Sequence, residues 1–371
     1  GARFGSSVAL GNGGDTLAVG ASHATDGTTT WAGAVYLFNR SNGVWSQKRK
    51  LASPSPASSG YFGSVVDLSD TGTTLAVGEE GADSAHLYAL DGTDTWGLQQ
   101  SVQGNNTDTG DNFGSALALS GDGLTLAVGA SGEDEASTVI ASVGGITNGG
   151  TNVGAVYVFT FDSAGASWSQ QMYLKAPNAE DSDAMGVSVA LSDDGNTLVA
   201  GASGEDGDGN GATGAGTVYA FTRDAGGLWT HQATLRASVP KSDDAFARES
   251  LALSSDGNRL AVSAHFDDSA ATGLDGQPAT TTTDVGAVHL FSRDGGGAWS
   301  GPVTVKPTNS ALSNLYFGVG FAFSNDGRTL AVGADGESSS TQDVICATAE
   351  SACTDAQANS GAVDAGALYL Y

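Results

Sequence analysis

Acidic residues gather in Gly-rich stretches of this sequence at spacings that could bind a calcium ion. The stretch GEDGDGNGATGAG matches positions 1, 3, 5 and 6 of a D-x-D-x-N-G calcium loop through Asp206, Asp208, Asn210 and Gly211. The match ends at position 12, where Thr217 replaces the bidentate Glu. Since Ca²⁺ prefers oxygen ligands, Asp206, Asp208 and Asn210 are candidate calcium ligands. The alternative is a solvated acidic loop.

Two further acidic stretches follow the same kind of apolar run. GEDEAS contains Glu133 and Asp134, and HFDDSAATGLDG contains Asp267, Asp268 and Asp275. Their carboxylates are further metal candidates, although neither stretch has the spacing of a complete calcium loop. Ca²⁺ is therefore the one cofactor that the sequence suggests.

No sequence motif for catalysis accompanies these acids. Gly209, Gly211 and Gly214 form a G-x-G-x-x-G pattern, but it leads into a predicted strand and lacks the helix N-terminus that binds dinucleotide phosphates. The chain has no G-x-S-x-G or H-E-x-x-H motif, and its 5 His residues are scattered. We therefore expect that the protein is not an enzyme.

Cysteine and asparagine residues give predictions about covalent modification. Cys346 and Cys353 lie in one long polar loop, where a local disulfide would imply an oxidising compartment; two reduced thiols are the alternative. Asn39 and Asn105 lie in the glycosylation sequons NRS and NNT, which function only in a eukaryotic secretory pathway.

The overall charge limits the partners. The 371 residues include 41 acidic and 14 basic ones, a formal net charge of -27. Nucleic acids and anionic membranes carry the same sign, so we expect neither as a partner, and no apolar stretch is long enough for membrane insertion. Cationic partners fit better, and such acidity suits a soluble protein outside the cell or at its surface.

The elements that carry these residues come from a six-fold repeat. The run TLAVG, or a close variant, has its leading Leu at Leu17, Leu75, Leu126, Leu198, Leu260 and Leu330. The copies span approximately residues 4–61, 62–112, 113–184, 185–245, 246–316 and 317–371. We expect a single repeat domain over residues 1–371.

Each repeat predicts four short antiparallel strands. A run such as FGSALAL precedes TLAVG, a run such as GAVYLF follows it, and a Trp-bearing run closes every copy but the last. His86 and His289 replace a Tyr of the third run, which favours a packing role. Because both faces of GAVYLF are apolar, each sheet needs neighbours on both sides. The sequence thus predicts an all-β fold, a β-propeller of six four-stranded blades whose last blade lacks its outer strand.

The FG openings followed by AVGA and GAVYLF resemble the FG-GAP repeat of integrin α-subunit propellers and of microbial extracellular proteins. The resemblance runs from Phe4 to Tyr371, although integrin propellers have seven blades. It implies calcium between the first two strands of a blade, in a D-x-D-x-D-G-x-x-D loop. Here that connection is as short as SGDGLT, which is too short to surround a calcium ion, so we do not expect calcium at this position. The Asp residues there are expected to serve the turn: Asp122, Asp194, Asp256 and Asp326.

Three functions remain open at this point. The first is an extracellular adhesion module that binds a protein or glycan through acidic loops on one propeller face, with or without Ca²⁺. The second is a structural subunit of a surface filament or sheath, which self-assembles by strand donation to the incomplete sixth blade. The third is a propeller hydrolase or lyase with an axial site.

Overall fold

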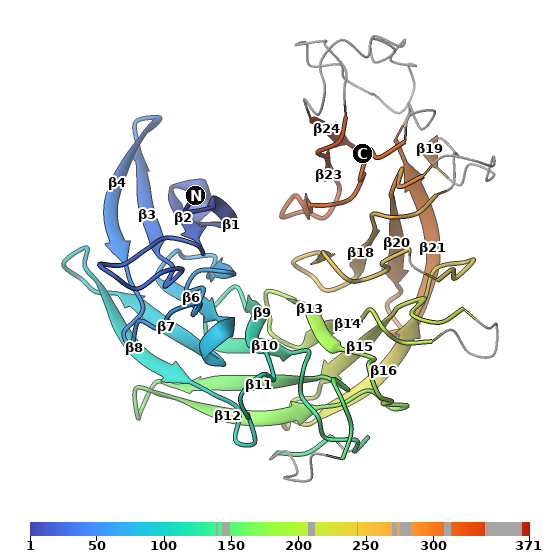
Figure 1. Cartoon of the computed structure of the whole chain (residues 1–371), viewed down its shortest axis with the longest axis horizontal. Helices are drawn as coiled ribbons and strands as arrows, with labels where there is room; N and C mark the ends of the chain where they lie inside the picture. The colour runs from blue at the N-terminus through green and yellow to red at the C-terminus, as the bar shows by residue number, and fades with distance from the viewer. Residues whose placement is uncertain are drawn as a thin grey trace. The chain divides into compact units, whose positions relative to one another are not determined.

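The structure, a computed structural model of the whole chain, consists of short strands in succession (Figure 1). It describes residues 1–138, 140–142, 149–206, 212–242, 244–268, 273–274, 283–307, 313–337 and 366–371. Within these ranges the only helices are the 3₁₀ turns η1 (Asn12–Gly14) and η2 (Glu80–Ala82). No helix of the described residues is long and apolar enough to cross a membrane.

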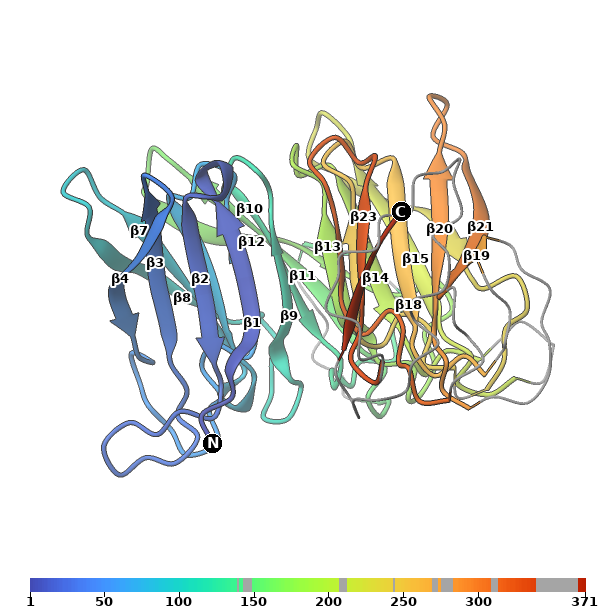
Figure 2. The same ribbon diagram turned by 90° about the horizontal axis from the view of Figure 1, so that it is seen from above.

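The first three repeats each form a four-stranded antiparallel sheet with the strands in chain order. The first sheet, whose strands lie side by side in Figure 2, contains β1 (Phe4–Gly11), β2 (Thr16–Ala21), β3 (Val35–Ser41) and β4 (Val44–Leu51). The second contains β5 (Val66–Leu68), β6 (Thr74–Glu79), β7 (Ser84–Leu90) and β8 (Trp96–Val102). The third contains β9 (Phe113–Leu119), β10 (Thr125–Ala130), β11 (Ala155–Asp162) and β12 (Ser167–Leu174).

The last three repeats form three more antiparallel sheets. The fourth contains β13 (Met185–Leu191), β14 (Thr197–Ala202), β15 (Thr217–Arg223) and β16 (Trp229–Leu235). The fifth contains β17 (Leu251–Leu253), β18 (Arg259–Ala264), β20 (Ala287–Arg293) and β21 (Trp299–Lys306), with the additional strand β19 (Gly273–Leu274) paired to the outer edge of β21. The sixth contains β22 (Phe321–Phe323), β23 (Leu330–Ala334) and β24 (Ala367–Leu370). The predicted six blades, with three strands in the last, are thereby confirmed.

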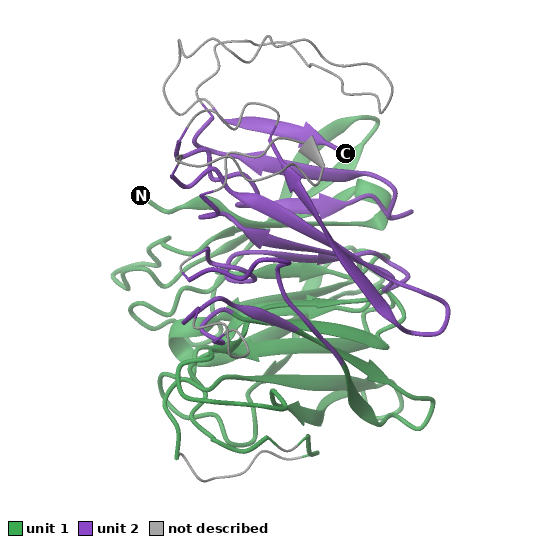
Figure 3. Ribbon diagram, turned by 90° about the vertical axis from the view of Figure 1, so that its right-hand side faces the viewer, with its two compact units in different colours: residues 1–202, 219–232 green, residues 203–218, 233–371 purple. Residues whose placement is uncertain are grey.

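The chain divides into two compact units (Figure 3). One consists of Gly1–Ala202 and Tyr219–Gln232, and the other of Ser203–Val218 and Ala233–Tyr371. The division passes through β15 and β16 of the fourth sheet, so it does not follow the repeat boundaries.

The hydrophobic core lies between successive sheets. Leu126 and Val128 of β10 pack in one cluster with side chains of the second sheet, such as Leu87. Ala127, which points to the opposite face of the same strand, packs in a cluster with Leu198 of the fourth sheet. Both faces of the third sheet are therefore buried, as the apolar pattern of its strands predicts.

The hairpin between the first and second strands is fixed by its Asp residue. Asp122 Oδ1 accepts hydrogen bonds from Ser120 Oγ at 2.6 Å and from the Leu124 backbone N–H at 2.9 Å. The same Ser-to-Asp bond occurs in three later blades, at Asp194, Asp256 and Asp326. The expectation that these four residues serve the turn is confirmed.

A glycine at the start of the third strand allows neighbouring sheets to touch. Gly154 forms a parallel bridge with Met185 of the next sheet and has a φ of +82°. A Cβ atom at Gly154 would lie 2.2 Å from both the backbone N and the backbone O of Met185. Only glycine fits this position, because it tolerates both the positive φ and the close approach of the backbone.

Candidate functional site

The loop between the second and third strands of a blade, here called the 2–3 loop, begins with an acidic residue in blades three to six. The backbone carbonyl of this residue accepts a hydrogen bond from the glycine that starts the third strand. The pairs are Glu133 with Gly154, Glu205 with Gly216, Asp267 with Gly286 and Glu337 with Gly366, at 2.8 to 3.0 Å. The 2–3 loops of blades three to six are therefore closed at their bases by the same hydrogen bond, although they differ in length.

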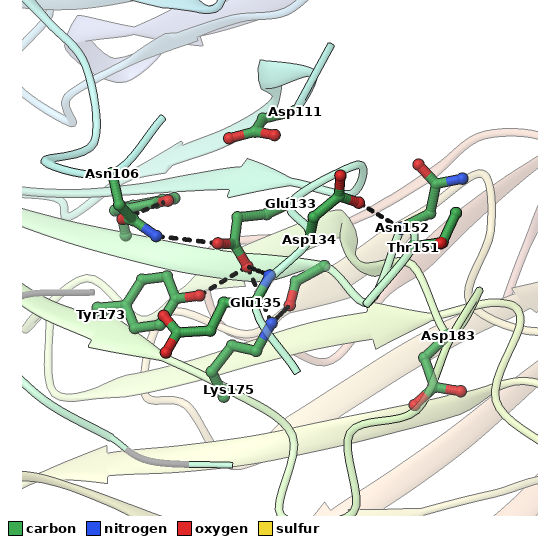
Figure 4. Close-up of polar contacts among 12 residues, drawn as sticks. Asn106, Asp111, Glu133, Asp134, Glu135, Thr151, Asn152, Tyr173, Lys175 and Asp183 are labelled. Carbon is green, nitrogen blue, oxygen red and sulfur yellow. Dashed lines mark hydrogen bonds and ion pairs between the residues drawn. The ribbon is translucent and has the colours of Figure 1, made fainter. Parts of the chain in front are cut away.

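In the third blade the side chain of this residue is buried and fully engaged (Figure 4). Glu133 Oε2 lies 2.9 Å from Lys175 Nζ and accepts a 2.6 Å hydrogen bond from the Tyr173 hydroxyl, while Oε1 accepts one of 2.9 Å from Asn106 Nδ2. Lys175 Nζ also donates to the Gly154 carbonyl at 2.7 Å. Burial lowers the pKa of Lys175, and the charge of Glu133 opposes that shift. The ion pair joins the 2–3 loop to the outer strand.

The fourth and fifth blades contain the same ion pair. Arg236 Nη2 lies 3.1 Å from Glu205 Oε1, and Lys306 Nζ donates to Asp267 Oδ1. Lys175, Arg236 and Lys306 each directly follow the last apolar residue of a fourth strand. The sequence analysis did not identify their role, although in the third, fourth and fifth blades a basic residue at this position accompanies the acid at the loop base.

The acidic residue that follows the loop base in the third, fourth and fifth blades has a different role. Asp134 Oδ1 accepts a hydrogen bond from the backbone N–H of Asn152 at 2.7 Å (Figure 4). The equivalent residues Asp206 and Asp268 accept bonds of 2.8 and 2.9 Å from the N–H groups of Gly214 and Asp284. These carboxylates hold together the two ends of the 2–3 loop.

The predicted metal ligands are thus mostly engaged with the protein itself. Glu133 and Asp267 are in ion pairs, and Asp134, Asp206 and Asp268 bind backbone N–H groups. No group of three His, Cys, Asp or Glu within the described ranges is placed to hold a metal ion. Asp208, Asn210 and Asp275 lie outside those ranges, so calcium binding by the loop of the fourth blade stays a prediction.

The predicted modification sites stay predictions as well. Cys346 and Cys353 lie outside the described residues. Asn39 is half-buried in β3, whereas Asn105 is exposed in the loop before β9 and its Oδ1 accepts a hydrogen bond from Gln170 Nε2 at 2.6 Å.

The fifth blade contains a pocket beside its loop base. Ser242, Asp244, Phe266, Asp268 and Asp284 line a pocket of about 230 Å³ within the second unit. Asp244 is 7% exposed, and its burial, with the nearby charge of Asp267 adding to the effect, raises the pKa of its carboxyl to about 7. The pocket therefore gathers three carboxyl groups, one of which changes charge near neutral pH.

The second blade contains a hydrogen-bonded relay that the sequence interpretation missed. His86 Nε2 lies 2.7 Å from Glu79 Oε2, and His86 Nδ1 lies 2.8 Å from Ser101 Oγ. Ser53 Oγ donates to the same Glu79 oxygen at 2.8 Å. The order serine, histidine, carboxylate is that of a nucleophile, its base and the group that orients the base. Glu79 and His86 are buried, whereas Ser101 is exposed. The sequence favours a packing role for His86, and the only sign of another role is that a His stands where most repeats have a Tyr.

Comparisons with known proteins agree with this architecture. Residues 96–159 and 168–221 match the FG-GAP repeat family. Similar solved structures include a candidate 6-phosphogluconolactonase from Bacteroides uniformis, with 14% identity, 89% of this chain and 78% of that chain covered, and a TM-score of 0.55. A periplasmic gluconolactonase from Pseudomonas aeruginosa has 15% identity, 89% and 81% coverage, and a TM-score of 0.53. A comparison with curated protein sequences gives no significant match.

The six sheets with their buried faces define a β-propeller. The two matched segments run from β8 to β11 and from β12 to β15, and the same motifs recur in the other blades. The protein is therefore a β-propeller in which residues 96–159 and 168–221 match the FG-GAP repeat family.

The expectation that the protein is not an enzyme needs correction. Two of the similar structures carry the names of gluconolactonases, so the reasoning from missing motifs to a missing activity was wrong. At 14 to 15% identity the likeness itself shows only the fold. The physical reason for the error is that an active site gathers residues distant in sequence, which a search for local motifs does not detect.

Proposed function

We propose that the protein binds cationic protein or glycan ligands outside the cell through the acidic loops of its blades. The observation that carries this proposal is a separation of charges. The basic residues Lys175 and Lys306 are buried in ion pairs at the loop bases, while Glu180, Asp181 and Asp206 are exposed. The buried cations neutralise acids at the bases, and the exposed carboxylates give the loops a negative potential.

The test compares two charge-matched variants in binding a Lys-rich peptide. Glu180→Gln/Asp181→Asn removes two charges from the loop that precedes β13, and we expect it to weaken binding severalfold. Asp162→Asn/Asp224→Asn removes two charges from hairpins between third and fourth strands, and we expect it to bind as the unaltered protein does. If the two double variants weaken binding equally, the effect of the acids is one of overall charge and the proposal is overturned. The proposal is also overturned if the unaltered protein does not bind the peptide at low salt.

Two further parts of this proposal rest on the sequence. Ca²⁺ would bind at Asp206, Asp208 and Asn210 and bridge the loop to anionic groups of a ligand. Self-assembly would use the edge of β24 in the three-stranded sixth blade, where Leu368 and Leu370 are exposed.

A second candidate function is hydrolysis of an ester or lactone by the second blade. The relay of Ser101, His86 and Glu79 favours it. With His86 Nε2–H donating to Glu79, Nδ1 takes the proton of Ser101 Oγ as that oxygen bonds to the substrate carbonyl carbon. The alkoxide leaves with this proton, and water then releases the acid from the acylated serine.

A matched pair of serine variants tests the second candidate. Ser101→Ala removes the nucleophile and is expected to abolish hydrolysis of an aryl ester and a δ-lactone. Ser53→Ala also removes a hydroxyl near the relay, but its bond goes to Glu79 and not to His86, so activity should persist. A fluorophosphonate should label Ser101. No hydrolysis by the unaltered protein would rule this function out.

A further inference from the structure

Three aromatic side chains of the first compact unit, His23, Trp31 and Tyr61, form a group that we call the aromatic cluster. The rings of Trp31 and Tyr61 are nearly parallel, with 21° between their planes and 6.3 Å between their centroids. The His23 ring contacts both, at centroid distances of 5.5 Å from Trp31 and 5.1 Å from Tyr61. Trp31 is 48% exposed, and the other two side chains are half-buried. The aromatic cluster is therefore at the surface and outside the core.

The backbone at Trp31 has a conformation that does not suit a tryptophan. Trp31 lies two residues before the glycine that starts the third strand, where the next three blades with long 2–3 loops have Asn152, Gly214 and Asp284. All four residues have a positive φ, between +50° and +59°, which Gly, Asn and Asp tolerate and bulky residues rarely adopt. Asn152 is exposed as well, so packing does not require an aromatic side chain at this position. Backbone strain that is kept for an exposed side chain is a sign of a functional site.

The polar atoms of the aromatic cluster are not engaged with the protein. Neither the Trp31 indole N–H nor the Tyr61 hydroxyl forms a hydrogen bond within the described part of the chain. His23 Nδ1 lies 3.2 Å from the hydroxyl of the preceding residue, and Nε2 has no such contact among the described residues. By contrast, the indole N–H groups of Trp168 and Trp229 each donate to a Gln side chain at 3.0 Å. The aromatic cluster thus combines apolar ring faces with hydrogen-bonding groups at their edges.

The surroundings of the aromatic cluster select against three kinds of partner. The side-chain charge that acts on His23 is the positive one of Arg3, which opposes a cationic ligand. The formal net charge of -27 opposes an anionic ligand. An apolar protein surface would bury the indole N–H and the hydroxyl without partners, which costs free energy. A neutral ligand with its own hydroxyl groups avoids all three costs.

We propose that the aromatic cluster binds a neutral sugar chain, with a pyranose ring stacked on Trp31. A pyranose with equatorial substituents presents C–H groups on its faces and hydroxyl groups at its edge. The faces match the aromatic rings, and the hydroxyl groups match the Trp31 N–H, the Tyr61 hydroxyl and His23 Nε2. This site goes beyond the proposed function, because it lies apart from the acidic residues tested there and its ligand needs no charge.

Calorimetric titration of the whole protein with cellohexaose, and with the N-acetylated chitin oligomer of the same length, tests the inference. We expect saturable binding of at least one of the two. Trp31→Asn places the residue of the third blade on the same backbone position, and it should weaken binding about tenfold. Trp45→Ala is the matched control, because Trp45 is a 40% exposed indole on β4 with the Arg40 guanidinium over its ring, and binding should be unchanged.

Thermal unfolding distinguishes a binding role of Trp31 from a packing role. Because Asn tolerates the positive φ, Trp31→Asn should melt at or above the temperature of the unaltered protein. A marked fall in melting temperature would assign Trp31 to packing and overturn the inference. Tyr61→Phe removes only a hydroxyl, so it should fold normally and weaken binding severalfold.

Two binding results would also overturn the inference: no binding of either oligosaccharide, or equal affinity of Trp31→Asn and Trp45→Ala. The Lys-rich peptide separates this site from the proposed function. Trp31→Asn should bind the peptide as the unaltered protein does, and Glu180→Gln/Asp181→Asn should bind the oligosaccharide as the unaltered protein does. If the peptide binds and neither oligosaccharide does, the sugar site fails while the proposed function stands; if an oligosaccharide binds and the peptide does not, the reverse holds.

Discussion

Lys175 Nζ lies 2.9 Å from Glu133 Oε2, and both side chains are at least 99% buried. This pair connects the base of the 2–3 loop to the outer strand of the third blade. The Tyr173 hydroxyl and the Gly154 carbonyl complete the hydrogen bonds of the two charged groups. A buried pair with satisfied hydrogen bonds is costly to break, because each partner alone would be an uncompensated charge.

Lys175→Met should destabilise the protein by about 3–5 kcal/mol, because Glu133 would remain buried without its counter-charge. Denaturant unfolding measures the loss. Lys48→Met is the control: Lys48 pairs with Asp94 at 3.2 Å with both side chains exposed, so its loss should cost about 1 kcal/mol or less. Equal effects of the two variants would contradict the role of the buried pair.

Gly154→Ala should destabilise the protein by more than about 2 kcal/mol, from backbone strain at positive φ and from collision with Met185. Gly92→Ala serves as its control, because a Cβ atom there has nothing within 4 Å and its φ is not positive. Thermal unfolding of both variants measures the difference. A Gly154→Ala variant as stable as Gly92→Ala would disprove the tight contact.

Asp244 should make stability depend on pH. In the folded state the pKa of its carboxyl is raised to about 7, mainly by burial, whereas the pKa of an Asp in an unfolded chain is about 4. Between these values the folded state holds a proton that the unfolded state has lost, so the free energy of unfolding falls as pH rises through the window. Asp244→Asn should flatten this fall when unfolding is measured at pH 5 and pH 8. An unchanged slope would show that Asp244 titrates normally.

Calcium should raise the melting temperature if the loop of the fourth blade binds it. Asp206→Asn/Asp208→Asn should abolish the increase, whereas Asp162→Asn/Asp224→Asn should retain it. The measurement is thermal unfolding with added Ca²⁺ and with a chelator. A melting temperature that is the same under both conditions would remove Ca²⁺ as a cofactor.

Cys346 and Cys353 should form a disulfide in protein isolated without reductant, as expected of a protein outside the cell. Mass spectrometry after alkylation measures it: neither thiol should react until a reductant is added. Free thiols on both residues in protein secreted by its host would contradict the oxidised state.

The sequence predicted the blades well because their signals are local. Leu126, Ala127 and Val128 alternate between two faces within one strand, and the turn at Asp122 uses residues two positions away. The extra strand β19 was not expected, since it has only two residues and no alternating pattern.

The side-chain clusters were harder to predict because they depend on strand register. Ser101 meets His86 across two strands whose pairing shifts at a bulge between Leu87 and Tyr88, and no pattern in the sequence places that bulge. Glu133 and Lys175 are likewise distant in sequence. Comparison of the repeats with one another would have related them. The acid lies seven residues after the leading Leu of the TLAVG run, and the base lies seven residues after the Trp of the fourth run, in the third, fourth and fifth blades alike.

The closed bases of the 2–3 loops have a practical consequence for protein engineering. In the third blade, hydrogen bonds to the Glu133 carbonyl and the Asp134 carboxylate join the two ends of the loop. These bonds do not involve the residues in the middle of the loop. The segments so closed differ widely in length, from 24–33 in the first blade to 337–366 in the sixth. A foreign peptide inserted between Asp134 and Asn152 should therefore leave the strands in register, which makes this position a graft site for displaying new sequences.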